Sequence, residues 1–284
     1  MIRVIYIILI QFFALSAFAQ KNPAYVLYNA KGNKVTYNKM VRKLSKVDVI
    51  LFGEHHDNPM SHWLQLELTN SLDQVRELTL GAEMIETDDQ AYLDLYLAGE
   101  IDRKGLDSLA RLWKNFHTDY APLVDYAKNN KIRFIGTNVP RRYASMVYRG
   151  GFEALDTLPG EEKSWIAELP IAYDKDLPGY QKMLEMGGSH GGENLPKAQA
   201  IKDATMGQFI HTNVEADRLF IHYNGSYHSD NYEGILWYLT RLDPNREYRT
   251  ITTVLQKDIS KLEDEFKGRA DFIICVPENM TRTY

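Results

Sequence analysis

The chain has 284 residues, with 33 lysine and arginine side chains, 38 aspartate and glutamate side chains and a net charge of −5 at pH 7. A mildly acidic chain lacks the basic footprint of a nucleic-acid-binding protein, so we expect no nucleic-acid partner. Its single cysteine, Cys275, excludes an internal disulfide.

Residues 1–19 have the pattern of a cleavable signal peptide. Arg3 is the only charge before an apolar run over residues 4–15, and small residues follow it up to Ala19. A membrane anchor is the alternative, but Gln11 interrupts the run, and a span needs about 20 apolar residues. We therefore expect export to the periplasm or cell envelope, and one domain over residues 20–284. No cysteine lies at the boundary, so there is no lipobox Cys for a lipid anchor.

The remainder of the chain alternates between short apolar runs and segments of helical periodicity. Residues 25–28 and 35–37 flank a turn, which predicts a small N-terminal hairpin. The apolar runs suit strands that are covered on both faces. Predicted strands cover residues 47–52, 78–84, 132–136, 219–223, 250–255 and 272–276, and predicted helices cover 60–72, 89–97, 123–128, 142–148, 198–214 and 232–242. The alternation indicates an α/β fold with a mostly parallel sheet flanked by helices.

Residues 150–196 interrupt this alternation. They contain Pro159, Pro170, Pro178 and Pro196, and a glycine-rich stretch at 187–192. Long segments without clear periodicity are usually functional or disordered. We therefore predict a helical or irregular insertion, or flap, on the core domain.

Polar residues follow the carboxyl ends of the predicted strands, where ligands gather in open α/β sheets. A Gly-Glu-His-His turn (53–56) follows the first of the long strands, and Asn58 and Pro59 can begin the next helix. A Gly-Ser-Tyr-His turn (225–228) follows the predicted strand at 219–223. Carboxylate and imidazole groups together suit zinc or manganese, or an acid–base pair. Capping and packing are the alternative roles for the candidate residues Glu54, His56, Glu83 and His228.

Four ordered segments resemble the ChaN-like haem-binding family, within the wider erythromycin-esterase/ChaN/Tiki superfamily. They are Gly53-Glu54-His55-His56-Asp57-Asn58-Pro59, Gly81-Ala82-Glu83-Met84, residues 199–206 and Asn224-Gly225-Ser226-Tyr227-His228. The resemblance covers roughly residues 47–276 and implies an α/β fold, haem binding and a role in haem or iron uptake at the cell envelope. It also implies haem held at a homodimer interface through a tyrosine ligand, with an outer-membrane haem uptake receptor as a possible partner.

The Tiki-like branch of the superfamily implies a different activity. By that resemblance the chain would be a metal-dependent hydrolase, a peptidase or esterase, and His56, Glu83 and His228 match its site by position. With Glu54 they make up the candidate catalytic and metal-binding residues. This chain departs from the family pattern at Lys202, which stands where many relatives have arginine, and this weakens a bidentate carboxylate or phosphate contact there.

The predicted insertion contains side chains that suit haem. Phenol is a known type of haem ligand, and imidazole can orient it through a hydrogen bond. Most tyrosines in a chain with 18 of them serve only in packing. The candidates for haem contact are Tyr180, which we expect as the leading iron ligand, with Tyr173, His190 and Met183.

Overall fold

The structure is a computed structural model that describes residues 23–284, apart from the side chains of residues 186–191. The predicted signal peptide therefore lies outside the described residues. Within the described part, no helix has both the length and the apolar character needed to cross a membrane.

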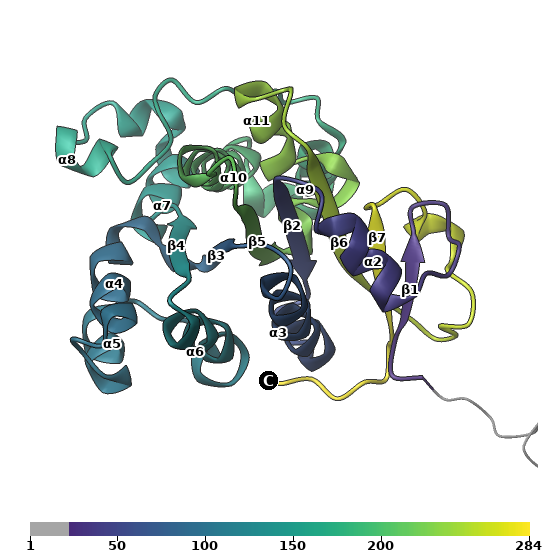
Figure 1. Cartoon of the computed structure of the whole chain (residues 1–284). Coiled ribbons are helices and arrows are strands. Elements are labelled where there is room, and N and C mark those ends of the chain that lie inside the picture. Colours follow the sequence, from purple (N-terminus) through teal and green to yellow (C-terminus); the bar gives the residue numbers. More distant parts are fainter. Residues whose placement is uncertain (1–22) are drawn as a thin grey trace, which may run out of the picture.

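One seven-stranded sheet forms the centre of the molecule, with the strand order β1-β7-β6-β2-β5-β3-β4 (Figure 1). Every pair of neighbours is parallel except β1 and β7, which are antiparallel. The strands are β1 (Val26–Asn29), β2 (Val49–Glu54), β3 (Leu78–Glu86), β4 (Arg133–Asn138), β5 (Leu219–Gly225), β6 (Tyr248–Gln256) and β7 (Phe272–Pro277). The predicted α/β class with a mostly parallel sheet is confirmed.

Helices connect these strands. The α-helices are α2 (Tyr37–Leu44), α3 (Pro59–Asp73), α4 (Gln90–Ala98), α5 (Arg103–Leu109), α6 (Ala121–Asn130), α7 (Arg141–Gly150), α8 (Gly160–Lys163), α9 (Pro178–Gly191), α10 (Asn194–Asn213) and α11 (Ile235–Leu242). Short helical turns are η1 (Thr87–Asp89), η2 (Phe116–Tyr120), η3 (Phe152–Leu155), η4 (Ser226–His228), η5 (Asp230–Tyr232) and η6 (Asp264–Phe266).

Helices cover both faces of the sheet, and the alternation of side chains along β2 shows why its sequence is apolar throughout (Figure 1). Ile50 and Phe52 pack on the face that α3 and α6 cover. Val49 and Leu51 point to the opposite face, into a cluster with residues of α10 and α11. A strand buried on both faces needs an apolar residue at nearly every position.

The N-terminal hairpin is smaller than predicted. β1 forms a single bridge, Tyr28 with Lys34, and takes β7 as its strand partner. Residues 35–37 are not a strand, because Thr36 caps α2 by accepting a hydrogen bond from Lys39 N. Side-chain capping thus begins a helix where alternation suggested a second strand.

Residues 150–196 include η3, α8 and α9. Leu155, Ile166 and Ile171 form an apolar cluster with Val147 of α7 and Ile201 of α10. The insertion therefore packs on the α7–α10 side of the core.

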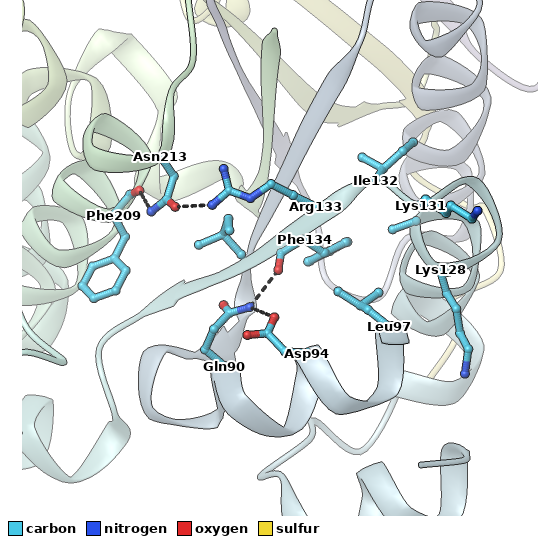
Figure 2. A pocket seen from close by; sticks show the side chains of 12 residues that line it. Gln90, Asp94, Leu97, Lys128, Lys131, Ile132, Arg133, Phe134, Phe209 and Asn213 are labelled. Carbon is cyan, nitrogen blue, oxygen red and sulfur yellow. Dashed lines mark hydrogen bonds between the residues drawn. The ribbon is translucent and has the colours of Figure 1, made fainter. Parts of the chain in front are cut away.

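Strand β4 lies at one edge of the sheet. Both ends of the Gln90 amide on α4 bond to backbone groups of this strand. Its Nε2 donates to Phe134 O at 3.0 Å (Figure 2), and its Oε1 accepts from Gly136 N at 2.6 Å. A cavity of about 550 Å³ lies beside this edge, lined by residues such as Lys128, Arg133 and Phe209. None of the predicted site residues whose side chains are described lines it.

Candidate functional site

The turn after β2 is shaped by close packing and by the start of α3. A methyl group on Gly53 would lie 2.9 Å from Ser226 Cα and 3.0 Å from Ile251 O, so only glycine fits there. Asn58 accepts hydrogen bonds from Met60 N and Ser61 N, both at 3.0 Å, and Pro59 begins the helix. These constraints place Glu54 and His56 at the carboxyl end of the sheet.

Glu54 is fully buried and has several polar partners. Its Oε1 accepts from the Tyr120 hydroxyl at 2.7 Å, its Oε2 accepts from Gln65 Nε2 at 2.6 Å, and His62 Nδ1 lies 3.2 Å from Oε2. Burial would raise the pKa of Glu54, but the hydrogen bonds and charges of His56 and His62 lower it to about 2. Glu54 is therefore a stable carboxylate.

His56 is held by that carboxylate. Its Nδ1 lies 2.9 Å from Glu54 Oε1, which makes Nδ1 the protonated nitrogen, and its ring packs edge-on against Trp113 at 4.9 Å. Burial would lower the pKa of His56, but the bond to Glu54 and the charge of Glu83 raise it. A methyl group on Gly225 would lie 2.9 Å from His56 Nε2, so glycine leaves room for the imidazole. The His56 side chain is 35% exposed, which leaves it accessible.

His228 lies between two carboxylates. Its Nε2 is 3.2 Å from Glu83 Oε1 and its Nδ1 is 2.5 Å from Asp203 Oδ1, while Glu83 Oε2 accepts from Gly225 N at 2.7 Å. Burial would lower the pKa of His228, but Glu83 and Asp203 raise it from 6.5 to about 10. The two carboxylates therefore favour the protonated imidazolium form of His228. In that form its ring can donate a proton.

Glu54, His56, Glu83 and His228 all line one pocket of about 550 Å³ at the carboxyl ends of β2, β3 and β5. We call this cavity the strand-end pocket. Its other walls include Trp113, Arg141, Lys202 and Tyr227. The volume falls within the range of roughly 300–1000 Å³ that is usual for small-molecule sites. The four side chains form two separate pairs, Glu54–His56 and Glu83–His228.

Tyr180, Tyr173 and Met183, the haem candidates of the insertion whose side chains are described, do not line the strand-end pocket. Tyr180 is 4% exposed, and its hydroxyl donates to Asp203 Oδ2 at 3.2 Å. Burial and the charge of Asp203 raise the pKa of Tyr180 far above its ordinary value. Tyr173 stacks on the Tyr180 ring at 5.5 Å, and Met183 is half-buried on α9. The side chain of His190 lies outside the described residues.

Tyr180 does line a smaller cavity of about 180 Å³ behind Asp203. Asp203 connects the two side chains, because one of its oxygens accepts from Tyr180 and the other contacts His228. In the conformation described, Tyr180 supports the Asp203–His228 pair.

Several site residues were missed by sequence reasoning. Asp203 and Gln199 lie four residues apart on α10 and both contact His228, with Gln199 Nε2 at 2.9 Å from His228 Nδ1. Their signal was two polar residues at helical spacing in a segment that is otherwise largely buried. Tyr120 carried no such signal, because nothing local to η2 points to Glu54.

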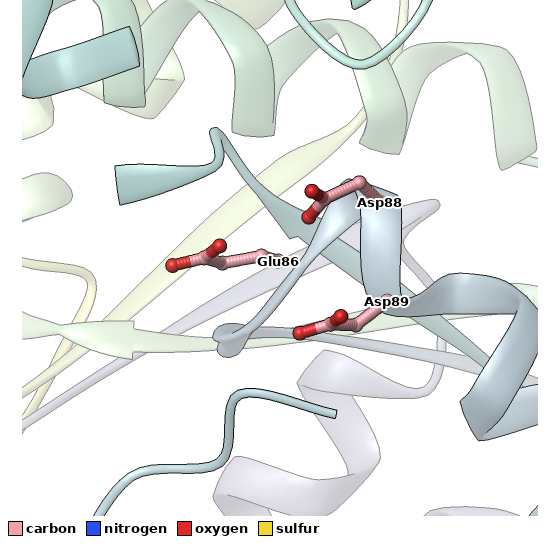
Figure 3. A group of neighbouring side chains, drawn as sticks. All are labelled: Glu86, Asp88 and Asp89. Atoms are coloured by element: carbon pink, nitrogen blue, oxygen red, sulfur yellow. The ribbon is translucent and has the colours of Figure 1, made fainter. Parts of the chain in front are cut away.

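A cluster of carboxylates, Glu86, Asp88 and Asp89, lies near the pocket at the end of β3 (Figure 3). Arg111 forms ion pairs with all three, at 2.9 Å to Glu86 and 3.1 Å to Asp89. Arg142 adds a contact of 2.6 Å to Asp88. The three carboxylates therefore belong to an ion-pair network in which two arginines offset most of their charge.

Comparison with known families and structures bears on both the fold and the ligand. Residues 40–239 match the family described as haem-binding uptake, Tiki superfamily, ChaN. No curated protein sequence matches the chain.

Solved structures show the same fold at low sequence identity. A structure described as cofacial haem binding to ChaN of Campylobacter jejuni is 19% identical, with a TM-score of 0.68, and the match covers 90% of this chain and 98% of that one. A variant of the erythromycin esterase EreC in its open conformation is 9% identical, with a TM-score of 0.52, over 90% and 98% of the two chains. A protein from Bacillus cereus is 11% identical, with a TM-score of 0.50, over 89% and 94%.

Proposed function

Because this chain belongs to the ChaN family of haem-binding uptake proteins in the Tiki superfamily, we propose that it is an exported haem-binding protein that serves haem or iron acquisition at the cell envelope. The observation that carries the proposal is the family match over residues 40–239. That range contains every residue that lines the strand-end pocket.

We propose that haem lies over the strand-end pocket. Trp113 and Tyr227 supply aromatic surface at its wall, and Tyr227 is 42% exposed. Its hydroxyl donates to Gly179 O at 2.6 Å, so it lies at the contact between η4 and α9. Haem has a large apolar face, which aromatic side chains cover well.

The choice of iron ligand lies between two phenols. Tyr180, the candidate from the sequence, would have to leave Asp203 and lose a proton that burial retains. Burial raises the pKa of Tyr227 as well, but its side chain is more exposed and its hydroxyl has only a backbone carbonyl to release. We therefore propose Tyr227 as the iron ligand, with Tyr180 as the alternative.

Absorption spectra with haemin test this choice. A phenolate ligand gives a high-spin ferric spectrum, and we expect Tyr227→Phe to lose it while Tyr180→Phe retains it. The reverse pattern would return the assignment to Tyr180. A wild-type protein that binds no haemin at all would refute haem binding.

Two further parts of the proposal concern partners. Cofacial haem binding is the description of ChaN of Campylobacter jejuni, which supports a homodimer with haem between two copies here. Two-fold pairing is also the commonest oligomer symmetry. An outer-membrane haem uptake receptor would then deliver or accept the haem.

Export and processing follow from the sequence pattern of residues 1–19. We propose a mature domain over residues 20–284 in the periplasm or cell envelope. Mass spectrometry of the protein from its native envelope tests this, since a retained N-terminus would contradict it.

Hydrolysis is the second candidate function, favoured by the Glu54–His56 pair. Glu54 orients His56 through Nδ1 and leaves Nε2 free to accept a proton, while the nearby His228 imidazolium can donate one. A divalent metal such as zinc or manganese would need the neutral imidazole of His56, with Glu54 or Glu83 beside it. His228 could join such a site only after losing its proton.

Esterase and peptidase assays on the purified protein test this candidate. We expect His56→Ala to lower any activity by at least about a hundredfold, because general-base catalysis contributes that much. The exposed His117 provides a matched control, His117→Ala, which should leave the activity unchanged. Equal activity in the wild type and His56→Ala would exclude this pair as its source.

A further inference from the structure

Two cations in the wall of the strand-end pocket have no ion-pair partner among the described residues. Arg141 is exposed and Lys202 is half-buried, and neither has a carboxylate of the described residues within ion-pair distance. Their neighbours differ, because Arg111 and Arg142 are both bound to the acidic cluster at the end of β3. Arg141 and Lys202 therefore place positive charge at the pocket that no described carboxylate pairs with directly.

Arg141 also begins a helix whose N-terminus lies at the same wall. β4 ends at Asn138, and α7 begins at Arg141 and runs for ten residues. The N-cap is Pro140, which supplies no side-chain hydrogen bond to the first turn. Uncapped N–H groups and the helix dipole both favour an anion at such a position.

Asn138 is an independent sign that a ligand group belongs there. It is 9% exposed and lines the strand-end pocket, yet its buried Oδ1 has no hydrogen-bond partner among the described residues. Burial of an unpaired amide costs free energy that a bound group would recover. An amide can rotate by half a turn about its last bond, so its NH₂ group can face a ligand oxygen.

We infer that Asn138, Arg141 and Lys202 form a carboxylate-binding subsite in the strand-end pocket. Arginine suits this ligand because its planar guanidinium can donate two parallel hydrogen bonds to a carboxylate. A single negative charge is preferred to a phosphate dianion, because Glu54 and Glu83 lie in the same pocket. Glu86 also lines the pocket, but Arg111 binds its carboxylate.

If the ligand is haem, the bound carboxylate would be one of its propionates, and this assignment rests on the proposed function. A small carboxylate acid could use the same subsite without any haem. Haemin dimethyl ester and succinate distinguish a haem propionate from a small carboxylic acid. Haemin is compared with haemin dimethyl ester, which keeps the iron and the ring but has no free carboxylate, and succinate serves as a haem-free probe.

Two variants of the full mature chain test the subsite. Arg141→Gln removes the charge, and we expect it to weaken haemin binding about tenfold, the scale of one charge-assisted hydrogen bond. Asn138→Ala removes the amide. We expect it to weaken haemin binding by a smaller factor without loss of thermal stability, because the Asn138 Oδ1 has no hydrogen-bond partner among the described residues to lose. A purely structural role for Asn138 would predict a lower melting temperature instead.

The control is Arg149→Gln, which removes one positive charge from the exposed last turn of α7. It should bind haemin as the wild type does. The dimethyl ester should bind the wild type about tenfold more weakly than haemin, and Arg141→Gln should not weaken it further. Succinate should raise the melting temperature of the wild type but not of Arg141→Gln or Asn138→Ala.

The outcomes separate the two proposals. If the wild type binds haemin and its ester equally and both variants bind like the wild type, the subsite is wrong and haem binding stands. If the wild type binds no haemin but the succinate effect depends on Arg141 and Asn138, haem binding is wrong and the subsite stands. If succinate has no effect and the wild type binds no haemin, both are wrong.

Discussion

At the residue scale, His228 shows how burial and charge together set a protonation state. An isolated buried imidazole loses its proton readily, because a low-dielectric interior disfavours the charged form. Glu83 and Asp203 reverse this, since each lies within hydrogen-bond distance of one ring nitrogen. The three groups form a buried charge triad that needs all its members, because removal of one leaves an unpaired charge.

The pH dependence of stability should report this triad. The pKa of His228 rises from 6.5 to about 10 on folding, so the folded state binds more protons than the unfolded state between these values. The stabilisation is fully present below pH 6.5 and is lost as the pH rises toward 10. We expect the free energy of unfolding to fall by as much as about 1.4 kcal/mol per pH unit between pH 7 and 9.

Chemical denaturation at pH 7, 8 and 9 measures this slope. His228→Gln should be less stable at pH 7 and should have a smaller slope than the wild type. The exposed His117 offers a control, since His117→Gln should retain the wild-type slope. An unchanged slope in His228→Gln would mean that the triad does not hold the proton.

At the element scale, the carboxyl ends of β2, β5 and β3 bring the site together. These strands are neighbours, and Glu54 pairs in register with Gly225. The parallel arrangement therefore places both Gly-x-x-His turns at one edge of the sheet. Helix α10, which packs on one face of the sheet, contributes Gln199 and Asp203, and both contact His228.

The edge strand β4 depends on a side chain in place of a neighbouring strand. Gln90→Ala would leave Phe134 O and Gly136 N without their side-chain partner. Two lost hydrogen bonds of this kind should reduce the free energy of unfolding by about 1 to 3 kcal/mol. An open edge should also make the protein more prone to aggregate.

Denaturant unfolding and light scattering test this role of Gln90. The exposed Gln74, just beyond α3, provides a control, since Gln74→Ala should change neither measurement. Equal stability of Gln90→Ala and the wild type would show that water satisfies the edge equally well.

At the scale of the whole molecule, the proposed haem site predicts ligand-dependent assembly. One strand-end pocket can cover only part of a flat macrocycle, and a second copy related by a two-fold axis would cover the rest. We expect the protein to shift from monomer toward dimer as haemin is added, one haem per chain. Analytical ultracentrifugation with detection at the haem absorption band measures both the mass and its haem content. A haemin-bound protein that stays monomeric would contradict the cofacial arrangement but not haem binding.

Much of this architecture can be read from local patterns in the sequence. β2 is apolar at successive positions because both of its faces are buried, and that run is visible without a structure. Gly53, Asn58 and Pro59 specify a tight turn and a helix start through their own backbone preferences. The α/β class and the placement of Glu54, His56 and His228 at strand ends follow from such signals.

Only the tertiary structure decided which groups meet at the site. Strand order, with β5 between β2 and β3, sets Glu54 beside Gly225, and no local pattern encodes it. The same holds for Asp203, which reaches His228 from 25 residues away, and for Tyr120, which reaches Glu54 from 66 residues away. Periodicity and turn preferences reflect interactions over a few residues, whereas these contacts depend on how the helices pack on the sheet. Tyr180, the iron ligand expected from the sequence, lies buried against Asp203, because its neighbours are set by the fold and not by its own segment.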